Sequence, residues 1–185
     1  MLIKDPDAIP DKWGKRPSDR SIGELLEGGV IILDKPSGPT SHQATAWVRD
    51  ALKCDRVGHG GTLDPYVSGV LPITLGKAVR LTDVVLSSDK EYVCLMRLHA
   101  DRPADRVTEV MSRFVGKIYQ LPPVRSAVKR QLRIRTIREL EVLDIVGRDV
   151  LFRVACDAGT YVRTLCVDIG DLLGCGANMV ELRRT

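Results

Sequence analysis

The sequence predicts an α+β fold with a mixed, mainly antiparallel sheet and flanking helices. Segments with strand and helix periodicity are interspersed without a regular βαβ rhythm, and residues 135–155 are typical of a hairpin. With 185 residues, 44% of them hydrophobic, the chain is long enough to bury one substantial core. We therefore expect one main domain, residues 21–185, preceded by an arm.

The first elements follow from local patterns. Residues 1–20 combine prolines with mixed charges and show no sustained period, so we expect an extended arm. Residues 29–33 predict a buried strand. Thr40 or Ser41 then begins a helix, because a hydroxyl residue precedes an apolar face at helical spacing. That face consists of Ala44, Trp47, Val48, Ala51 and Leu52.

The middle of the sequence predicts a loop and two strands. Residues 58–66 are rich in glycine and form the loop. Residues 70–75 are apolar, but Pro72 would confine this strand to an edge or make it irregular. Residues 91–99 alternate in the way a strand requires. One face of that strand would carry Tyr92, Cys94, Met96 and Leu98.

The last third predicts two helices around the hairpin. The first helix ends at Gly116. The second is capped by Thr160 and ends at Gly174. Its apolar stripe consists of Val162, Leu165, Cys166, Ile169 and Leu173. Residues 181–185 are strand-like with no turn after them, so we expect the domain to be incomplete at its C-terminal side.

The charge of the chain is concentrated in one segment. The formal net charge is only +4, yet residues 122–138 contain six basic residues and no acidic one. Such a block can follow a phosphate backbone, and it can equally be a solvated strand and turn. The six are Arg125, Lys129, Arg130, Arg133, Arg135 and Arg138.

The composition also excludes several classes of protein. Five cysteines without a CxxC pair indicate neither a disulfide framework nor a zinc site, which favours a reducing, cytoplasmic setting. The sequence has no apolar run of about 18 residues, so we expect no membrane span. It also lacks the pattern of a signal peptide.

One loop presents a candidate for chemistry. Gly58, Gly60 and Gly61 permit close backbone approach to a ligand, and Asp64 directly precedes a proline. Asp64 can be a reactive carboxylate or merely part of an Asx turn. His59 in the same loop can contact a substrate or only bond the backbone.

Several separate motifs occur together and in a fixed order. They are LDKPSGPTSH (residues 33–42), GTLDP (61–65), KEY (90–92), AGTYVRTL (158–165) and ELRRT (181–185). This set resembles the TruB-type pseudouridine synthases, and is more similar to their dyskerin-type relatives that are guided by box H/ACA RNA. The resemblance covers about residues 28–185, so it implies the catalytic fold of that family for the main domain.

The resemblance implies roles for seven residues. Asp64 would be the catalytic nucleophile, Tyr92 the aromatic residue at the base, and Arg163 the basic partner of the carboxylate. The remaining four would bind or support the substrate. Leu182 would help to enclose the uracil, His59 would contact the flipped nucleotide, and Lys35 and Pro36 belong to the first motif, which supports the catalytic loop.

The implied reaction explains these residue types. A C–N glycosidic bond breaks, the uracil rotates, and a C–C bond to carbon 5 forms, without any cofactor or metal. The carboxylate can add to the base or to the sugar. The nucleotide must leave its stack to react, and Tyr92 is a candidate acceptor for the proton on carbon 5.

Two segments favour the RNA-guided branch. The catalytic loop reads GHGGTLDPYVSGVLPI, and the basic segment reads PPVRSAVKRQLRIRTI. Arg125, Lys129 and Arg130 are then candidate contacts to RNA. The resemblance implies three kinds of partner: substrate rRNA or tRNA, a box H/ACA guide RNA, and small accessory proteins of the guide particle, in the nucleolus if the cell is eukaryotic.

The family pattern is not matched throughout. Relatives continue past the position of Thr185 into a PUA domain, which we expect to be absent here, so guide binding is an open question. A stand-alone enzyme acting on the TΨC loop of tRNA, or a non-catalytic RNA-binding scaffold, would also fit. Modification without guide RNA would indicate the first alternative.

Overall fold

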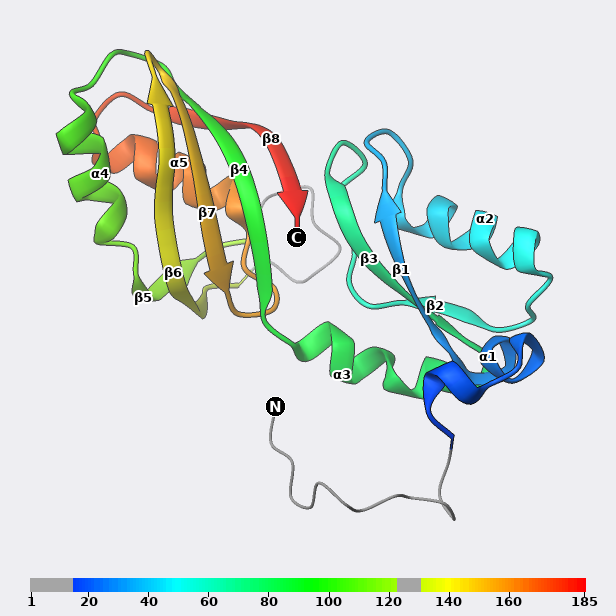
Figure 1. Cartoon of the computed structure of the whole chain (residues 1–185). Coiled ribbons are helices and arrows are strands. Elements are labelled where there is room, and N and C mark those ends of the chain that lie inside the picture. The colour runs from blue at the N-terminus through cyan, green and yellow to red at the C-terminus, as the bar shows by residue number, and fades with distance from the viewer. Residues whose placement is uncertain (1–14, 123–130) are drawn as a thin grey trace.

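The computed structural model describes residues 15–122 and 131–185, and it confirms an α+β fold. One eight-stranded sheet contains the strands in the order β1-β3-β8-β4-β7-β6-β5, with β2 also paired to β3. All pairs are antiparallel except β3 with β8. The sheet joins two halves, each with its own helices and its own core (Figure 1).

The N-terminal half is the smaller. Capping boxes begin both of its α-helices, from Ser21 in α1 and from Thr40 in α2, as the sequence predicts for the second helix. Its core contains Ala44, Leu71, Ile73 and Leu75. The elements are η1 (Pro17–Asp19), α1 (Ile22–Gly28), β1 (Val30–Lys35), α2 (Ser41–Leu52), β2 (Val57–His59), β3 (Ser68–Leu75) and η2 (Gly76–Leu81).

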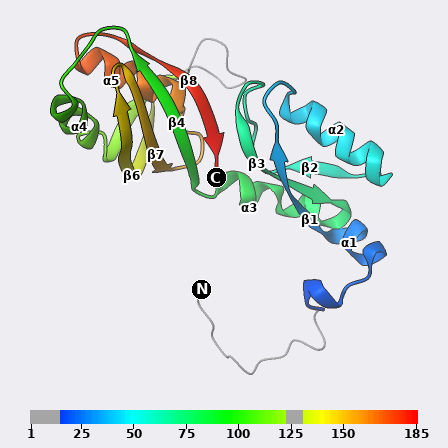
Figure 2. The ribbon, with the colours of Figure 1, turned by 45° about the horizontal axis from the view of Figure 1, so that its top comes forward.

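The C-terminal half contains the larger core. Helices α4 and α5 cover one face of its strands (Figure 2). The alternation predicted for residues 91–99 is confirmed, since Cys94, Met96 and Leu98 are buried in this core. The elements are α3 (Thr82–Ser87), β4 (Lys90–Leu98), α4 (Ala104–Ser112), β5 (Gly116–Gln120), β6 (Arg133–Val146), β7 (Asp149–Cys156), α5 (Val162–Leu172) and β8 (Ala177–Arg184).

Pro72 predicted either an edge strand or an irregular one, and the first of these alternatives is wrong. Strand β3 lies inside the sheet, and Pro72 stands opposite Ile32 of β1. On the other side of β3, the pairing with β2 reaches only as far as His59, and the Pro72 carbonyl accepts a hydrogen bond from Gly60 at 2.8 Å. A missing N–H is tolerated here because the ladder with β2 ends at this position.

The two halves are joined by a very short strand pairing. Only Ser68 and Gly69 of β3 pair with Arg183 and Arg184 of β8, while α3 makes the covalent connection (Figure 1). Gly69 has φ +103°, and a Cβ there would lie 2.0 Å from the carbonyl oxygen of Arg184. The close approach of the two strands therefore requires glycine.

Replacing Gly69 with alanine should lower the free energy of unfolding by at least about 2 kcal/mol, from backbone strain and the clash with β8. Gly147→Ala is the matched control, because Gly147 also has a positive φ but a Cβ there meets nothing within 4 Å. Chemical denaturation of both variants checks this. Equal losses would show that the junction tolerates a side chain.

Candidate active site

A cavity of about 560 Å³ opens where the two halves meet. This volume is typical of a small-molecule or nucleotide site. The residues that line it come from both halves and include Gly61, Leu63, Asp64, Val67, Leu86, Lys90, Tyr92, Gly159, Thr160, Arg163, Met179, Leu182 and Arg184. The structure thus brings together four residues singled out from the sequence: Asp64, Tyr92, Arg163 and Leu182.

Asp64 and Arg163 form an ion pair across this cavity. Asp64 lies on the loop between β2 and β3, and Arg163 is the second residue of α5. Nη2 of the guanidinium donates directly to Oδ2 of the carboxylate. Both side chains are about half exposed, so the pair faces the space that a ligand would occupy. A charge-assisted bond of this kind fixes the direction of the carboxylate.

The buried side chain of Lys35 holds the loop that carries Asp64. This side chain is fully buried, and its Nζ donates to the carbonyl oxygens of Pro36 at 2.8 Å, Pro65 at 3.0 Å and Val67 at 2.8 Å. Burial lowers the pKa of the ammonium. Neither Lys35 nor Pro36 lines the cavity. The contacts of Lys35 favour support of the loop and not a direct contact with a substrate.

A buried serine provides a second support that the sequence reasoning missed. The Ser41 hydroxyl accepts from the Leu63 amide at 2.8 Å and donates to the Leu63 carbonyl at 3.1 Å. Sequence reasoning considered Ser41 only as a possible helix cap, a role that Thr40 fills. The start of α2 therefore fixes the backbone immediately before Asp64.

The wall formed by β4 and β8 contains the aromatic and apolar residues. Tyr92 stands opposite Arg184, and Leu182 stands opposite Cys94, in the antiparallel register of the two strands. Burial raises the pKa of Tyr92, against the opposing influence of the nearby Arg184 guanidinium. Arg184 is itself buried and donates to the carbonyls of Val70 at 2.6 Å and Gly61 at 3.1 Å. Arg184 thus ties β8 to Gly61 and Val70 on either side of Asp64, a contact that sequence reasoning missed.

His59 lies at the end of β2 and does not line the cavity. Its ring meets that of His42 edge-on, with centroids 5.1 Å apart. Burial, reinforced by His42 and Arg184, lowers the pKa of His59. Its Nδ1 is buried without a hydrogen-bond partner in the described part of the chain.

The other predictions for the site have mixed outcomes. Arg125, Lys129 and Arg130 lie outside the described residues. The prediction that Thr160 caps α5 is wrong: the helix begins after Tyr161 without a side-chain cap, because the Thr160 hydroxyl donates instead to the Asp157 carbonyl at 2.7 Å. Among residues 15–122 and 131–185, no cluster of three or more His, Cys, Asp or Glu side chains could hold a metal. All five cysteines are free thiols.

Comparison with known protein families identifies the chain. Residues 49–162 match the N-terminal domain of the TruB family pseudouridylate synthases. The chain belongs to the TruB family of pseudouridine synthases. Residues 1–45 match the DKCLD domain, and residues 163–185 match the C-terminal domain of tRNA pseudouridylate synthase B.

Individual relatives of this TruB family member are archaeal. It is 54% identical over 183 residues to the probable tRNA pseudouridine synthase B of Methanothermobacter thermautotrophicus, and 56% identical over 187 residues to that of Pyrococcus furiosus. These alignments cover 99% and 100% of the chain, but only 56% and 55% of the relatives. The TruB family chain thus spans about half the length of these relatives.

Solved structures show the same fold. A chain in the crystal structure of a Cbf5–Nop10–Gar1 complex superposes with a TM-score of 0.89 at 56% identity. Another, in an H/ACA RNP bound to a substrate RNA containing 2′-deoxyuridine, gives 0.86 at 50% identity. Each match covers 100% of this TruB family chain, and 56% and 55% of those chains respectively. In the part of the chain that the structure describes, no helix has the length and hydropathy to cross a membrane.

Proposed function

We propose that the chain isomerises uridine to pseudouridine in rRNA or tRNA, as the catalytic subunit of a box H/ACA guide particle. The observation that carries this proposal is the Asp64–Arg163 ion pair, which lies in a cavity with Tyr92 and Leu182 on its wall. The guided function is supported by the similarity to a chain of an H/ACA RNP bound to a substrate RNA.

In this proposal Asp64 is the nucleophile. Its carboxylate adds covalently to the base or to the sugar, the C1′–N1 bond breaks, and the C1′–C5 bond forms after the uracil has turned. The bond between Asp64 and the substrate then breaks, which restores the free carboxylate. Carbon 5 gives up its proton, and N1 gains one. Arg163 directs the carboxylate toward the reacting atoms. The protein supplies orientation and charge, and the reaction needs no cofactor.

The uridine must be extruded from its RNA strand to reach Asp64. Tyr92 and Leu182 lie on adjacent strands of the cavity wall, where they are placed to contact the extruded base. Lys35 and Pro36 would act by supporting the loop. His59 would contact the flipped nucleotide, and Arg125, Lys129 and Arg130 would contact the backbone of the RNA.

Replacing Tyr92 with phenylalanine tests its proposed role as the proton acceptor for carbon 5. We expect single-turnover conversion to slow by about 100-fold, because general-base catalysis contributes this much, while packing of the ring against the base is retained. Single-turnover kinetics and the RNA dissociation constant are measured for both proteins. Full conversion at the normal rate would leave Tyr92 with a packing role alone.

The guided function is tested by mass spectrometry of uridine-containing RNA, incubated with the chain and accessory proteins in the presence and absence of a guide RNA. Product only with the guide supports the proposal. Product on the TΨC loop of tRNA without any guide would establish a stand-alone enzyme, which the names of the archaeal relatives favour. If no product forms with or without the guide RNA, the chain would be assigned as a non-catalytic RNA-binding scaffold. The free cysteines fit the reducing, cytoplasmic setting that we propose.

A further inference from the structure

The position of Arg163 depends on the turn that precedes it. Helix α5 begins after Tyr161 without a side-chain cap, and the Gln120 side chain of β5 holds the backbone of Tyr161, accepting from its amide at 2.9 Å and donating to its carbonyl at 3.1 Å. Residues 158–163 form one wall of the cavity. Whatever holds this turn therefore also sets the distance from Arg163 to Asp64.

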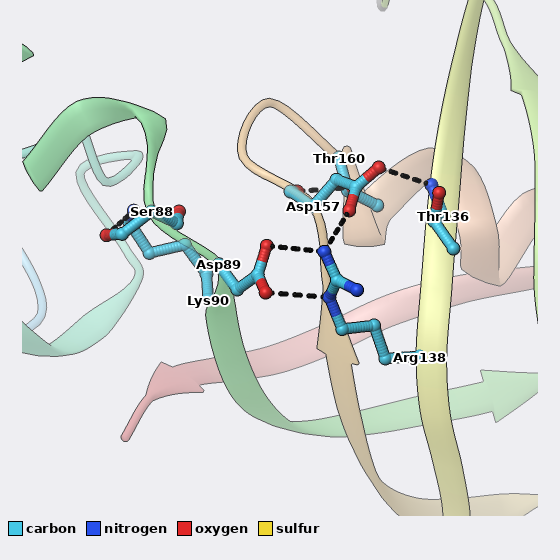
Figure 3. Close-up of polar contacts among 7 residues, drawn as sticks. All are labelled: Ser88, Asp89, Lys90, Thr136, Arg138, Asp157 and Thr160. Carbon is cyan, nitrogen blue, oxygen red and sulfur yellow. Dashed lines mark hydrogen bonds and ion pairs between the residues drawn. The ribbon is translucent and has the colours of Figure 1, made fainter. Parts of the chain in front are cut away.

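Asp157 holds the beginning of the turn (Figure 3). One carboxylate oxygen accepts from the Thr136 amide at 2.9 Å, and the other accepts from Nη2 of Arg138 at 3.1 Å. The Thr160 hydroxyl and amide both donate to the Asp157 carbonyl, at 2.7 and 3.2 Å. The contact with Thr136, together with the guanidiniums of Arg138 and Arg135, lowers the pKa of Asp157.

Arg138 also binds the residue that precedes β4. Its Nε and Nη2 pair with the two carboxylate oxygens of Asp89, at 2.7 and 3.0 Å (Figure 3). Asp89 directly precedes β4, the strand that carries Lys90 and Tyr92 into the cavity. Lys90 in turn donates to carbonyls at the end of α3. One guanidinium thus bridges the entry to β4 and the turn before α5.

A β-bulge places Arg138 between these two carboxylates. The register of β6 with β7 shifts between Ile137 and Glu139, so Arg138 is the extra residue of the strand. Bulges bend a strand locally and redirect one side chain, often beside an active site. We attribute the direction of the Arg138 side chain to this bulge: the side chain points toward the turn before α5 and does not lie along the face of the sheet.

Stability does not explain the bridge. The side chains of Arg138 and Asp89 are each 52% exposed, and ion pairs that exposed contribute little to folding. A phosphate contact is also disfavoured, because two carboxylates already engage the guanidinium. We propose that Arg138 is a positioning residue, which holds the α5 turn against β4 so that Arg163 meets Asp64 inside the cavity.

The test compares Arg138→Met with a matched control, Arg97→Met. Arg97 makes a bidentate pair with Asp149, at 2.7 and 2.6 Å, in which the arginine side chain is 57% exposed, and Arg97 does not line the cavity. Arg138→Lys is the conservative variant, because an ammonium keeps the charge but cannot form the bidentate pair. For each protein we measure single-turnover pseudouridine formation, the RNA dissociation constant, and hydrogen exchange of the Thr160 and Tyr161 amides.

Arg138→Met should slow single-turnover conversion by about tenfold, with the RNA dissociation constant within about twofold of wild type. Exchange at Thr160 and Tyr161 should become at least about fivefold faster, because the turn opens more often. The conversion rate and the exchange rates of Arg138→Lys should lie between those of wild type and Arg138→Met. Arg97→Met should match wild type in all three measurements. The methionine keeps the apolar stem, so the fold is retained.

Three results would overturn the proposal: unchanged exchange and rate, the same changes in Arg97→Met, or weaker RNA binding with an unchanged rate, which would make Arg138 an RNA contact. The inference about catalysis rests on the proposed function, but hydrogen exchange does not. If the wild-type chain forms no product and Arg138→Met still exchanges faster at the turn, the proposed function fails while the positioning of the turn stands.

Discussion

Replacing Asp64 with alanine is expected to abolish pseudouridine formation, with a loss of about 10⁴-fold or more, because no other carboxylate lines the described part of the cavity. The measurement is mass spectrometry of the modified RNA under single-turnover conditions. The RNA should still bind, since Asp64 contributes a negative charge and no attraction for phosphate. The fold should also be retained, because the side chain is about half exposed.

Two further variants make this result specific. Asp64→Asn preserves the shape of the side chain and removes the nucleophile, so it should be as inactive as alanine. Asp55→Ala removes an exposed carboxylate from the turn before β2 and should be fully active. Activity of Asp64→Ala within tenfold of wild type would exclude Asp64 as the nucleophile, whichever atom of the substrate is attacked.

Lys35→Met should have the second largest effect, on stability and activity together. The methionine fills a similar volume but leaves the carbonyls of Pro36, Pro65 and Val67 without their buried donor. We expect the free energy of unfolding to fall by about 3 kcal/mol or more, since each buried unpaired acceptor is costly. The loop carrying Asp64 should lose its orientation, and activity should be lost with it. Denaturation and single-turnover assays check both effects.

Lys77→Met is the appropriate comparison for Lys35. The Lys77 side chain is 82% exposed and, among the described residues, forms an ion pair with Glu27 alone, at 3.5 Å, so its loss should change neither stability nor rate. If Lys35→Met kept normal activity while losing stability, the ammonium would support the fold but not the catalytic loop. Normal stability would show that water replaces the donor.

The sequence correctly predicted those helices and strands that are determined by neighbouring residues alone. The helix after Thr40 follows from a hydroxyl cap and an apolar face, and the face of β4 follows from its alternation. Pro72 and Thr160 were interpreted wrongly for the same reason. Whether a strand tolerates proline depends on where its neighbour β2 stops, and whether Thr160 caps a helix depends on the competing Asp157 carbonyl. Neither fact is visible in the adjacent residues.

The residues of the candidate site also fall into two groups, those that the sequence predicted and those that it did not. The motifs indicated Asp64, Tyr92, Arg163 and Leu182, and the structure brings these four together. The residues that hold them were missed. The Ser41 and Arg184 side chains bond to backbone groups 22 to 123 positions away, and a sequence pattern carries no record of such pairings. Ser41 and Arg184 both lie in motifs that were recognised, but the hydrogen bonds that their side chains form were not predicted.

The narrow junction between β3 and β8 has a consequence for how activity is lost. Asp64 belongs to one half, its partner Arg163 belongs to the other, and only two residues of each strand pair between them. Parting the halves would separate the carboxylate from the guanidinium and withdraw Leu63 and Val67 from the larger core, while the smaller core stays intact. Openings of limited extent cost less than global unfolding. Heating should therefore inactivate this protein before it denatures it.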